Sequence, residues 1–563
     1  MKASASIHQH QAVVQPSDQF RFAGKYTISY RNFVLCLLLL VTFILYSGAL
    51  RNHFLIGWDD GEYLSSPLIN GEGPIDMPEI FSSFQLGMYQ PLAVLSFALN
   101  HKISGNIAWP FILVNILLHL VNTWLVFRLT ERWMKGWIPG IITAIFFALH
   151  PMHVEAVAWI STRSSGLFSL FYLLGLLAWD KYLKGMQMKH YLLALLFGLL
   201  ALFSKSMAAT FPVVLFLMDF FQKRPFSKKV ILEKLPFLAL SILFGIIAIK
   251  AAGSFGHISE LQTEYSILQR FFLILYALGF YLIKFIIPLN LSAIYAFPEL
   301  VNGFLPAYVY LTAIVPVLTT AGIWISGQNR HEFAFAGLFF LITISMVLPL
   351  YWSRIFITAD RYTYLPYIGL GMIVARWLTR AWNSRKKLDK STLRYLIAAS
   401  GLVLFTLSAA TASRIRIWRD TPLLLTDVIE KKRSDVDLAH GYFYLANYYD
   451  AADNVDEALK FYNLALSRNA NYPLALNNRG ILKGKTGNPV SAIKDFDNAI
   501  KTKPDYAEAW YNRGLATYQT GAVEQACEDW QKALSLGFKP ARDALWRYCQ
   551  RQDPPTLDPP PDN

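Results

Sequence analysis

Long apolar runs constrain the fold of this chain more than any other feature. Their lengths suit helices that cross a bilayer, where about 20 residues are needed. With 54% hydrophobic and only 16% charged residues, the sequence predicts an all-α polytopic membrane helical bundle of about 11–12 transmembrane helices. Twelve runs are expected to be helical, at about 33–50, 109–129, 138–150, 164–180, 190–204, 207–221, 231–251, 268–287, 305–326, 333–352, 361–379 and 395–413.

Basic residues indicate how the bundle is oriented. Residues 1–434 hold 38 Lys and Arg against 21 Asp and Glu, whereas residues 435–563 hold 14 against 17. Basic clusters that follow apolar runs are expected on the cytoplasmic side. Residues 1–32 are then a cytoplasmic tail, 33–413 the membrane domain, and 51–108 its first extracytoplasmic loop. The basic residues are dispersed between apolar runs, which argues against nucleic acid as a partner.

The number of crossings decides the side of the C-terminal part. A cytoplasmic N-terminus and an outward C-terminal part require an odd number, and twelve is even. We expect residues 268–287, which carry Arg270 and Lys284 and end at Pro288, to be re-entrant or interfacial. If all twelve runs cross, the C-terminal part is cytoplasmic instead.

A 34-residue repeat follows a connector at 414–438. The small residues Ala446, Gly480 and Gly514 recur at one position of three copies, a pattern that resembles the tetratricopeptide repeat. The second copy departs from it at Arg479 and Lys483. We expect three repeats plus a capping helix at 439–552 and a disordered, proline-rich tail at 553–563. Such an array binds peptides, or it serves as a spacer or dimerisation surface.

Only three cysteines occur, Cys36, Cys527 and Cys549. They are too few to indicate a disulfide framework or a thiolate metal site.

Three carboxylates crowd into four positions after the first apolar run, at Asp59, Asp60 and Glu62. Acidic groups at a membrane face have lost part of their hydration, which makes them candidates for function. The alternative is a turn, since Asp-Asp-Gly also reverses a chain. The acidic loop that follows favours the functional interpretation.

A second motif, at the outward end of the third run, contains His150, His153 and Glu155. It suggests either a metal site or a network for phosphate and hydroxyl groups. Without a definite fourth ligand the metal question stays open, and a divalent ion is permitted but not required. The alternative is a pair of helix-capping interfacial histidines.

Cations at the same membrane face include Lys205, Arg354 and Arg361. A single cation at a membrane edge usually reaches toward the headgroups from an anchoring position. Several cations near an acidic loop suit an anionic lipid donor and a hydroxyl acceptor, because Arg and Lys offset phosphate charge while a carboxylate accepts a proton.

In order along the chain, these motifs resemble the transmembrane-and-tetratricopeptide O-mannosyltransferases and their bacterial relatives, within the C-type glycosyltransferases. The resemblance rests on the Asp-Asp loop, the His150-Pro-Met-His153-Val-Glu155 segment, Lys205-Ser206, Asp360-Arg361-Tyr362 and the Trp418-Arg419-Asp420 lead into the repeats. It implies transfer of a sugar from a polyprenyl-phosphate donor to a hydroxyl acceptor, with protein Ser or Thr as one option, on the extracytoplasmic face.

The resemblance also assigns roles. Asp59 or Asp60 is implied as the catalytic carboxylate of an inverting displacement, and the substrate-binding residues are implied to be Glu62, His150, His153, Glu155, Arg163, Lys205, Arg361 and Tyr362. The resemblance also implies that the protein lies in the inner membrane of a bacterium. Its repeats are then extracytoplasmic and recruit an acceptor or partner. A non-enzymatic membrane-anchored repeat scaffold is the alternative, and a transporter of lipid-linked saccharides comes third.

Overall fold

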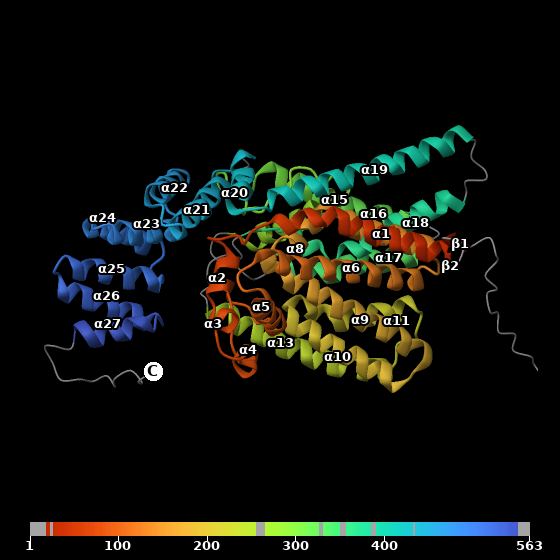
Figure 1. Ribbon diagram of the computed structural model, residues 1–563, viewed down its shortest axis with the longest axis horizontal. Helices are drawn as coiled ribbons and strands as arrows, with labels where there is room; N and C mark the ends of the chain where they lie inside the picture. The colour runs from red at the N-terminus through yellow and green to blue at the C-terminus, as the bar shows by residue number, and fades with distance from the viewer. Residues whose placement is uncertain are drawn as a thin grey trace, which may run out of the picture.

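The computed structural model describes residues 19–22, 26–254, 265–325, 330–349, 356–383, 390–431 and 434–549. These residues form a helical bundle with a helical solenoid beyond one of its ends (Figure 1). The strands β1 (Gln19–Phe22) and β2 (Tyr26–Ser29) pair antiparallel at the opposite end of the bundle. The solenoid end and the hairpin end are named here for these features. The expected tail at 553–563 and Arg354 lie outside the described residues.

Each of the twelve expected apolar runs contains a helix, which confirms the all-α membrane bundle. In the described ranges, seven helices are long and apolar enough to cross a membrane alone, and eight if the bent pair Trp137–Leu149 and Pro151–Ala158 counts as one span. The expected 11–12 crossings stay a prediction. The twelve helices are α1 (Tyr30–Ser47), α6 (Ala108–Trp133), α7 (Trp137–Leu149), α9 (Arg163–Gly185), α10 (Met188–Ser204), α11 (Phe211–Phe221), α13 (Leu235–Ser254), α15 (Ile267–Ile286), α16 (Ala307–Ile325), α17 (Arg330–Ile344), α18 (Tyr367–Asn383) and α19 (Lys390–Ile417).

Helices α1 and α19 both end at the solenoid end. The backbone N–H of His53, just after α1, donates to Arg419 O at 2.8 Å, and Thr421 Oγ1 donates to Ile56 O at 2.9 Å. The first loop and the chain that leads to the repeats therefore lie at one end of the bundle (Figure 1). Because α1 starts at the hairpin end, the chain makes an odd number of lengthwise passages from the start of α1 to the end of α19.

Helix α15 accounts for the odd number, because both its ends contact the solenoid end. Tyr265, just before the helix, donates its hydroxyl to Pro298 O at 2.9 Å, and His150 Nε2 lies 3.1 Å from Phe285 O. Ala296 N, in the chain that follows, donates to Asp437 of the solenoid at 2.8 Å. Although its length and composition alone suit a span, α15 has the contacts expected of a re-entrant or interfacial segment.

Short helices cover the solenoid end of the bundle. They position the polar side chains that the sequence analysis singled out. They are η2 (Gly48–Arg51), α2 (Asp59–Ser65), α3 (Pro67–Asn70), α4 (Met77–Ser82), α5 (Pro91–Ser104), η3 (Pro151–His153), α8 (Val154–Ala158), η4 (Ile160–Thr162), η5 (Ser206–Thr210), η6 (Ser345–Val347) and η7 (Asp360–Thr363). At the other end, α12 (Lys228–Leu232) precedes α13.

The solenoid follows the helix α20 (Thr421–Glu430) and has the three repeats expected from the 34-residue spacing. Its helices are α21 (Asp435–Ala451), α22 (Val455–Arg468), α23 (Pro473–Lys485), α24 (Pro489–Thr502), α25 (Ala507–Gln519), α26 (Val523–Ser535) and the capping helix α27 (Pro540–Tyr548). The repeated small residues allow close packing: a Cβ at Gly480 would lie 2.7 Å from the Phe496 ring, and one at Gly514 2.6 Å from Trp530.

Two departures from the repeat pattern have a structural reason. Arg479 Nε and Nη2 donate to the two oxygens of Asp495 at 2.9 and 2.6 Å, and Lys483 adds an ion pair to the same carboxylate at 2.8 Å. Arg513 and Asp529 form the equivalent pair in the third repeat. The charged residues at these positions therefore hold the two helices of a repeat together.

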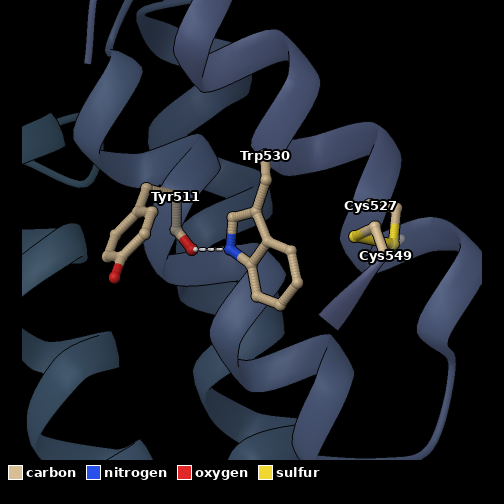
Figure 2. The surroundings of a disulfide bond; sticks show 4 residues. All are labelled: Tyr511, Cys527, Trp530 and Cys549. Carbon is tan, nitrogen blue, oxygen red and sulfur yellow. Dashed lines mark hydrogen bonds between the residues drawn. A yellow bond between two sulfur atoms is a disulfide. The ribbon is translucent and has the colours of Figure 1, made fainter. Parts of the chain in front are cut away.

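The cysteine count did not indicate a disulfide framework, and the structure contains one disulfide. Cys527 on α26 is bonded to Cys549 at the end of α27, and Figure 2 shows the bond beside Trp530, whose Nε1 donates to Tyr511 O at 3.2 Å. The residues are 22 positions apart. The fold of the third repeat against the capping helix brings them together, which a cysteine count does not reveal.

Candidate active site

Asp60, in the first turn of α2, is buried and fully bonded. Its Oδ2 accepts from Leu55 N at 2.8 Å, and its Oδ1 accepts from Ser161 N at 3.0 Å and from the Ser161 hydroxyl. These bonds join the first loop to η4, two segments a hundred residues apart in sequence. Burial raises the pKa of Asp60 to about 6, although the bonds from Leu55 and Ser161 oppose this rise. Asp60 is thus placed to hold the loop.

Asp59, its neighbour, has a different environment. Asp59 is partly exposed and lines a cleft. Burial raises its pKa to about 6, against the opposing charge of Arg361, while the nearby carboxylates Glu62 and Glu155 raise it further. A carboxylate with this pKa is mostly ionised at pH 7 and is a stronger base than an ordinary aspartate. Of the two aspartates, Asp59 is the one placed to take a proton from a molecule in the cleft.

The cleft lies between α2 and the first two repeats. Its volume is about 780 Å³, within the range of small-molecule sites. The membrane domain and the solenoid both contribute to its wall. The lining residues are Ile56, Gly57, Trp58, Asp59, Gly61, Glu62, Leu64, Ser65, Tyr444, Asn447, Asp450, Ala451, Asn478 and Lys485.

Close contacts fix these two walls against each other. The rings of Trp58 and Tyr444 stack with centroids 4.8 Å apart and planes 5° from parallel. Gly57 adopts φ +79°, and a Cβ there would lie 2.7 Å from Tyr448 N, so the loop backbone touches the backbone of α21. Only glycine combines this dihedral angle with so close an approach.

Arg361 and Glu155 form an ion pair beside Asp59. Arg361 N donates to Glu155 Oε2 at 2.9 Å, and its guanidinium pairs with Oε1. The guanidinium also lies over the rings of Trp159 and Tyr362, 5.3 and 5.0 Å from their centroids. The pair links η7 to α8 and brings a cation close enough to Asp59 to affect its pKa.

The two histidines of the second motif are buried among aromatic rings. His153 Nδ1 lies 2.8 Å from Phe147 O, and His150 Nε2 lies 3.1 Å from Phe285 O. Neither histidine lines the cleft. Both histidines bond to backbone carbonyls, which agrees with the alternative that they are helix-capping, interfacial residues. They support the segment that carries Glu155.

Arg163 is also buried, at the start of α9. It lies over the Phe97 ring, 4.6 Å from its centroid. Its donors are used by groups of α5 and α6, with bonds from Nε to Asn115 Oδ1 at 3.0 Å, from Nη1 to Ser96 Oγ at 3.0 Å and to Asn100, and from Nη2 to Phe111 O at 2.5 Å. The arginine therefore holds α5, α6 and α9 together, and a phosphate would have to displace these partners.

Lys205, between α10 and η5, donates to Ser165 Oγ at 2.7 Å. Ser165 follows η4, which carries Ser161, the partner of Asp60. Lys205 therefore lies at the same end of the bundle as Asp60, although it does not line the cleft.

Sequence reasoning missed the contribution of the repeats to this cleft. Tyr444, Asn447, Asp450, Asn478 and Lys485 occupy positions that the repeat pattern leaves variable, so periodicity gave no signal for them. Over the residues that the structure describes, no three His, Cys, Asp or Glu side chains are grouped as metal ligands. The divalent ion that the sequence leaves open stays a prediction.

Family comparisons agree with the two-part architecture. Residues 90–251 match the family of dolichyl-phosphate-mannose-protein mannosyltransferases, and residues 491–521 match a tetratricopeptide repeat. The chain is therefore similar to membrane mannosyltransferases in one part and to repeat proteins in the other. These matches confirm the resemblance inferred from the sequence.

Two individual relatives match over short stretches of the chain. The chain is 43% identical over 94 residues to Protein O-mannosyl-transferase TMTC2 of Mus musculus, which covers 17% of this chain and 11% of the relative. It is 34% identical over 124 residues to Protein O-mannosyl-transferase Tmtc1 of Drosophila melanogaster, covering 22% and 14%. The chain thus spans a small part of the length of these relatives. A crystal structure of ArnT from Cupriavidus metallidurans bound to undecaprenyl phosphate shares 14% identity at a TM-score of 0.38, covering 88% of this chain and 80% of that one.

Proposed function

We propose that this multi-pass membrane protein is a glycosyltransferase that moves a sugar from a polyprenyl-phosphate donor to an acceptor hydroxyl at the solenoid end of the bundle. The observation that carries the proposal is Asp59, a carboxylate of raised pKa that faces a cleft and lies beside the Arg361–Glu155 pair. The similarity of residues 90–251 to dolichyl-phosphate-mannose-protein mannosyltransferases supports the donor class, with mannose as the first sugar to test.

The step is a single displacement. Asp59 takes the proton of the acceptor hydroxyl as its oxygen attacks the anomeric carbon, and the bond from that carbon to the phosphate oxygen breaks. The electron pair leaves with the polyprenyl phosphate, whose charge is offset by Arg361 and Lys205. Attack opposite the leaving group inverts the anomeric centre.

The remaining predicted residues support this step. Asp60 and Glu155 position Asp59 and Arg361 respectively, and His150, His153 and Arg163 hold the helices that carry them. Glu62 and Tyr362 stay candidates for substrate contact, Glu62 from the cleft wall and Tyr362 beneath the Arg361 guanidinium. A divalent ion would offset phosphate charge in addition to the cations, and its need is tested by transfer assays with and without a chelator.

We place the solenoid end on the extracytoplasmic side of a bacterial plasma membrane. Disulfides persist in oxidising compartments, and the Cys527–Cys549 bond lies in the solenoid. In intact cells, a membrane-impermeant maleimide should label a cysteine introduced at exposed Asp453 in a variant without Cys36, Cys527 and Cys549. Labelling only after the membrane is opened would place the repeats in the cytoplasm.

The test of the proposed activity is reconstitution of the full chain in liposomes with labelled mannose on a polyprenyl phosphate and a pool of short peptides that contain serine and threonine. Label attached to peptide hydroxyls supports the proposal. If every polyprenyl-linked hexose fails as donor while the repeats still bind peptides, the membrane-anchored scaffold is the better account.

A further inference from the structure

The cleft is built half from repeat residues, and this bears on what the proposed enzyme accepts. We propose that the acceptor is an extended polypeptide that lies in the cleft between α2 and the first two repeats, with a Lys or Arg beside its hydroxyl residue. This inference rests on the proposed function and deepens it. The repeats then form one wall of the active site instead of a separate recruiting domain.

Asparagine side chains of the three repeats form a hydrogen-bonded chain that ends at the cleft. Asn512 Nδ2 donates to Asn477 Oδ1 at 3.0 Å, Asn477 to Asn478 at 3.3 Å, and Asn478 to Asn447 at 3.1 Å. This chain of amides runs through all three repeats and ends at the two asparagines that line the cleft, Asn447 and Asn478. The Oδ1 atoms of Asn447 and Asn478 accept bonds within the solenoid, and their Nδ2 groups keep N–H donors that can pair with peptide carbonyls.

The amides are held in place, which limits the entropy lost when a chain binds. Asn447 Oδ1 also accepts the Tyr462 hydroxyl at 2.7 Å, and Asn477 is fully buried. Fixed amides along an extended surface suit an extended polypeptide, whose backbone offers donors and acceptors at regular intervals.

The aromatic residues argue against a saccharide as the acceptor that lies in this cleft. Trp58 and Tyr444 are its two large aromatic lining residues among the described part of the chain. Their rings are stacked on each other, so the stacked faces are covered and unavailable to a sugar ring. The polar groups of the cleft are amides and charges instead.

The charges that line the cleft indicate which side chain the acceptor carries beside its hydroxyl residue. Glu62, Asp59 and Asp450 line the cleft together with a single cation, Lys485. Neither Glu62 nor Asp450 forms an ion pair with another described residue within 4.0 Å. The net negative wall attracts a cationic side chain and disfavours an anionic one.

The test is binding of short fluorescent peptides to the purified full chain without donor, so that no turnover occurs. Three peptides share a central threonine and differ in its neighbours, which are lysine, glutamine or glutamate. We expect the lysine peptide to bind about threefold to fivefold more tightly than the glutamine peptide, and the glutamate peptide most weakly. Added salt should reduce this preference.

Two cleft variants separate charge from backbone recognition. Asp450→Asn should remove most of the lysine preference, whereas Asn478→Ala should weaken all three peptides to a similar extent. Asp456→Asn and Lys501→Gln, at exposed positions of the solenoid outside the cleft, are matched controls and should change nothing.

Equal affinities for the three peptides, no binding, or cleft variants that match the wild-type chain would each overturn the inference. Its failure is distinguishable from failure of the proposed function. Peptides that bind as expected but never receive sugar contradict the enzyme alone, while sugar transfer that is indifferent to Asp450→Asn and Asn478→Ala contradicts the acceptor site alone.

Discussion

Tyr444 of the first repeat stacks on Trp58, the residue that precedes the aspartate pair, with ring centroids 4.8 Å apart. The repeats are thus attached to the acidic loop itself. Stacked aromatic pairs of this kind contribute about 0.5–1.5 kcal/mol beyond their buried area. The contact couples the position of the solenoid to that of Asp59, and changes in this contact should affect transfer.

Gly57→Ala tests that coupling. The new Cβ would lie 2.7 Å from Tyr448 N, at a positive φ, so the loop and α21 must separate at a cost of about 1–3 kcal/mol. We expect a lower melting temperature and a higher KM for the acceptor. Gly61→Ala is the matched control, because its Cβ has no atom within 4 Å. Equal behaviour of the two variants would show that the contact has no role.

The pH dependence of transfer follows from Asp59. Its pKa is about 6 in the folded chain, so kcat/KM should rise through about pH 6 and level off above it, with apparent pKa values that belong to Asp59 and Asp60 together. A rate that is flat between pH 5 and 7 would contradict a role for Asp59 as base.

Stability should show the opposite trend. The folded chain binds this proton more tightly than the unfolded chain, where the pKa is near 3.8. The stabilisation linked to Asp59 is therefore complete below about pH 4 and is lost as the pH rises through about 6. Asp59→Asn should raise the melting temperature at pH 7 and have less effect at pH 4. A variant destabilised at pH 7 would show that ionised Asp59 holds the fold together.

Arg361 is best tested together with its partner. Arg361→Ala alone would leave the buried Glu155 without its counterion, at a cost of about 3–5 kcal/mol, and would confuse folding with function. In the double variant that carries both Glu155→Gln and Arg361→Gln, we expect a higher KM for the polyprenyl donor and little change in the KM for the peptide. An equal loss of both affinities would assign Arg361 a purely structural role.

The sequence predicted the parts of the fold that depend on local pattern. Apolar runs placed all twelve bundle helices, and the spacing of Ala446, Gly480 and Gly514 placed the repeats, because run length and a fixed spacing can both be read along the sequence without knowledge of the packing. The mismatch in parity showed that one run is exceptional, and the charges of Arg270 and Lys284 pointed to α15, whose contacts agree with this prediction. By contrast, the Cys527–Cys549 bond depends on how α27 packs on α26, which no local pattern records.

The site was only partly predictable for the same reason. Charge density marked Asp59 and Asp60 as a pair, but the pattern does not distinguish them. Their difference arises from Ser161, a hundred residues away, which bonds Asp60 and leaves Asp59 at the cleft. Likewise, Asn447 and Asn478 reach the cleft only because the solenoid docks on Gly57.

The most direct test of the account is the single variant Asp59→Asn, compared with wild type for mannose transfer in liposomes and for peptide binding without donor. We predict that transfer falls by about 10²-fold or more, the usual contribution of a general base, while the affinity for the glutamine peptide is maintained and the melting temperature at pH 7 is not lowered. Transfer at the wild-type rate by a folded Asp59→Asn variant would contradict the account.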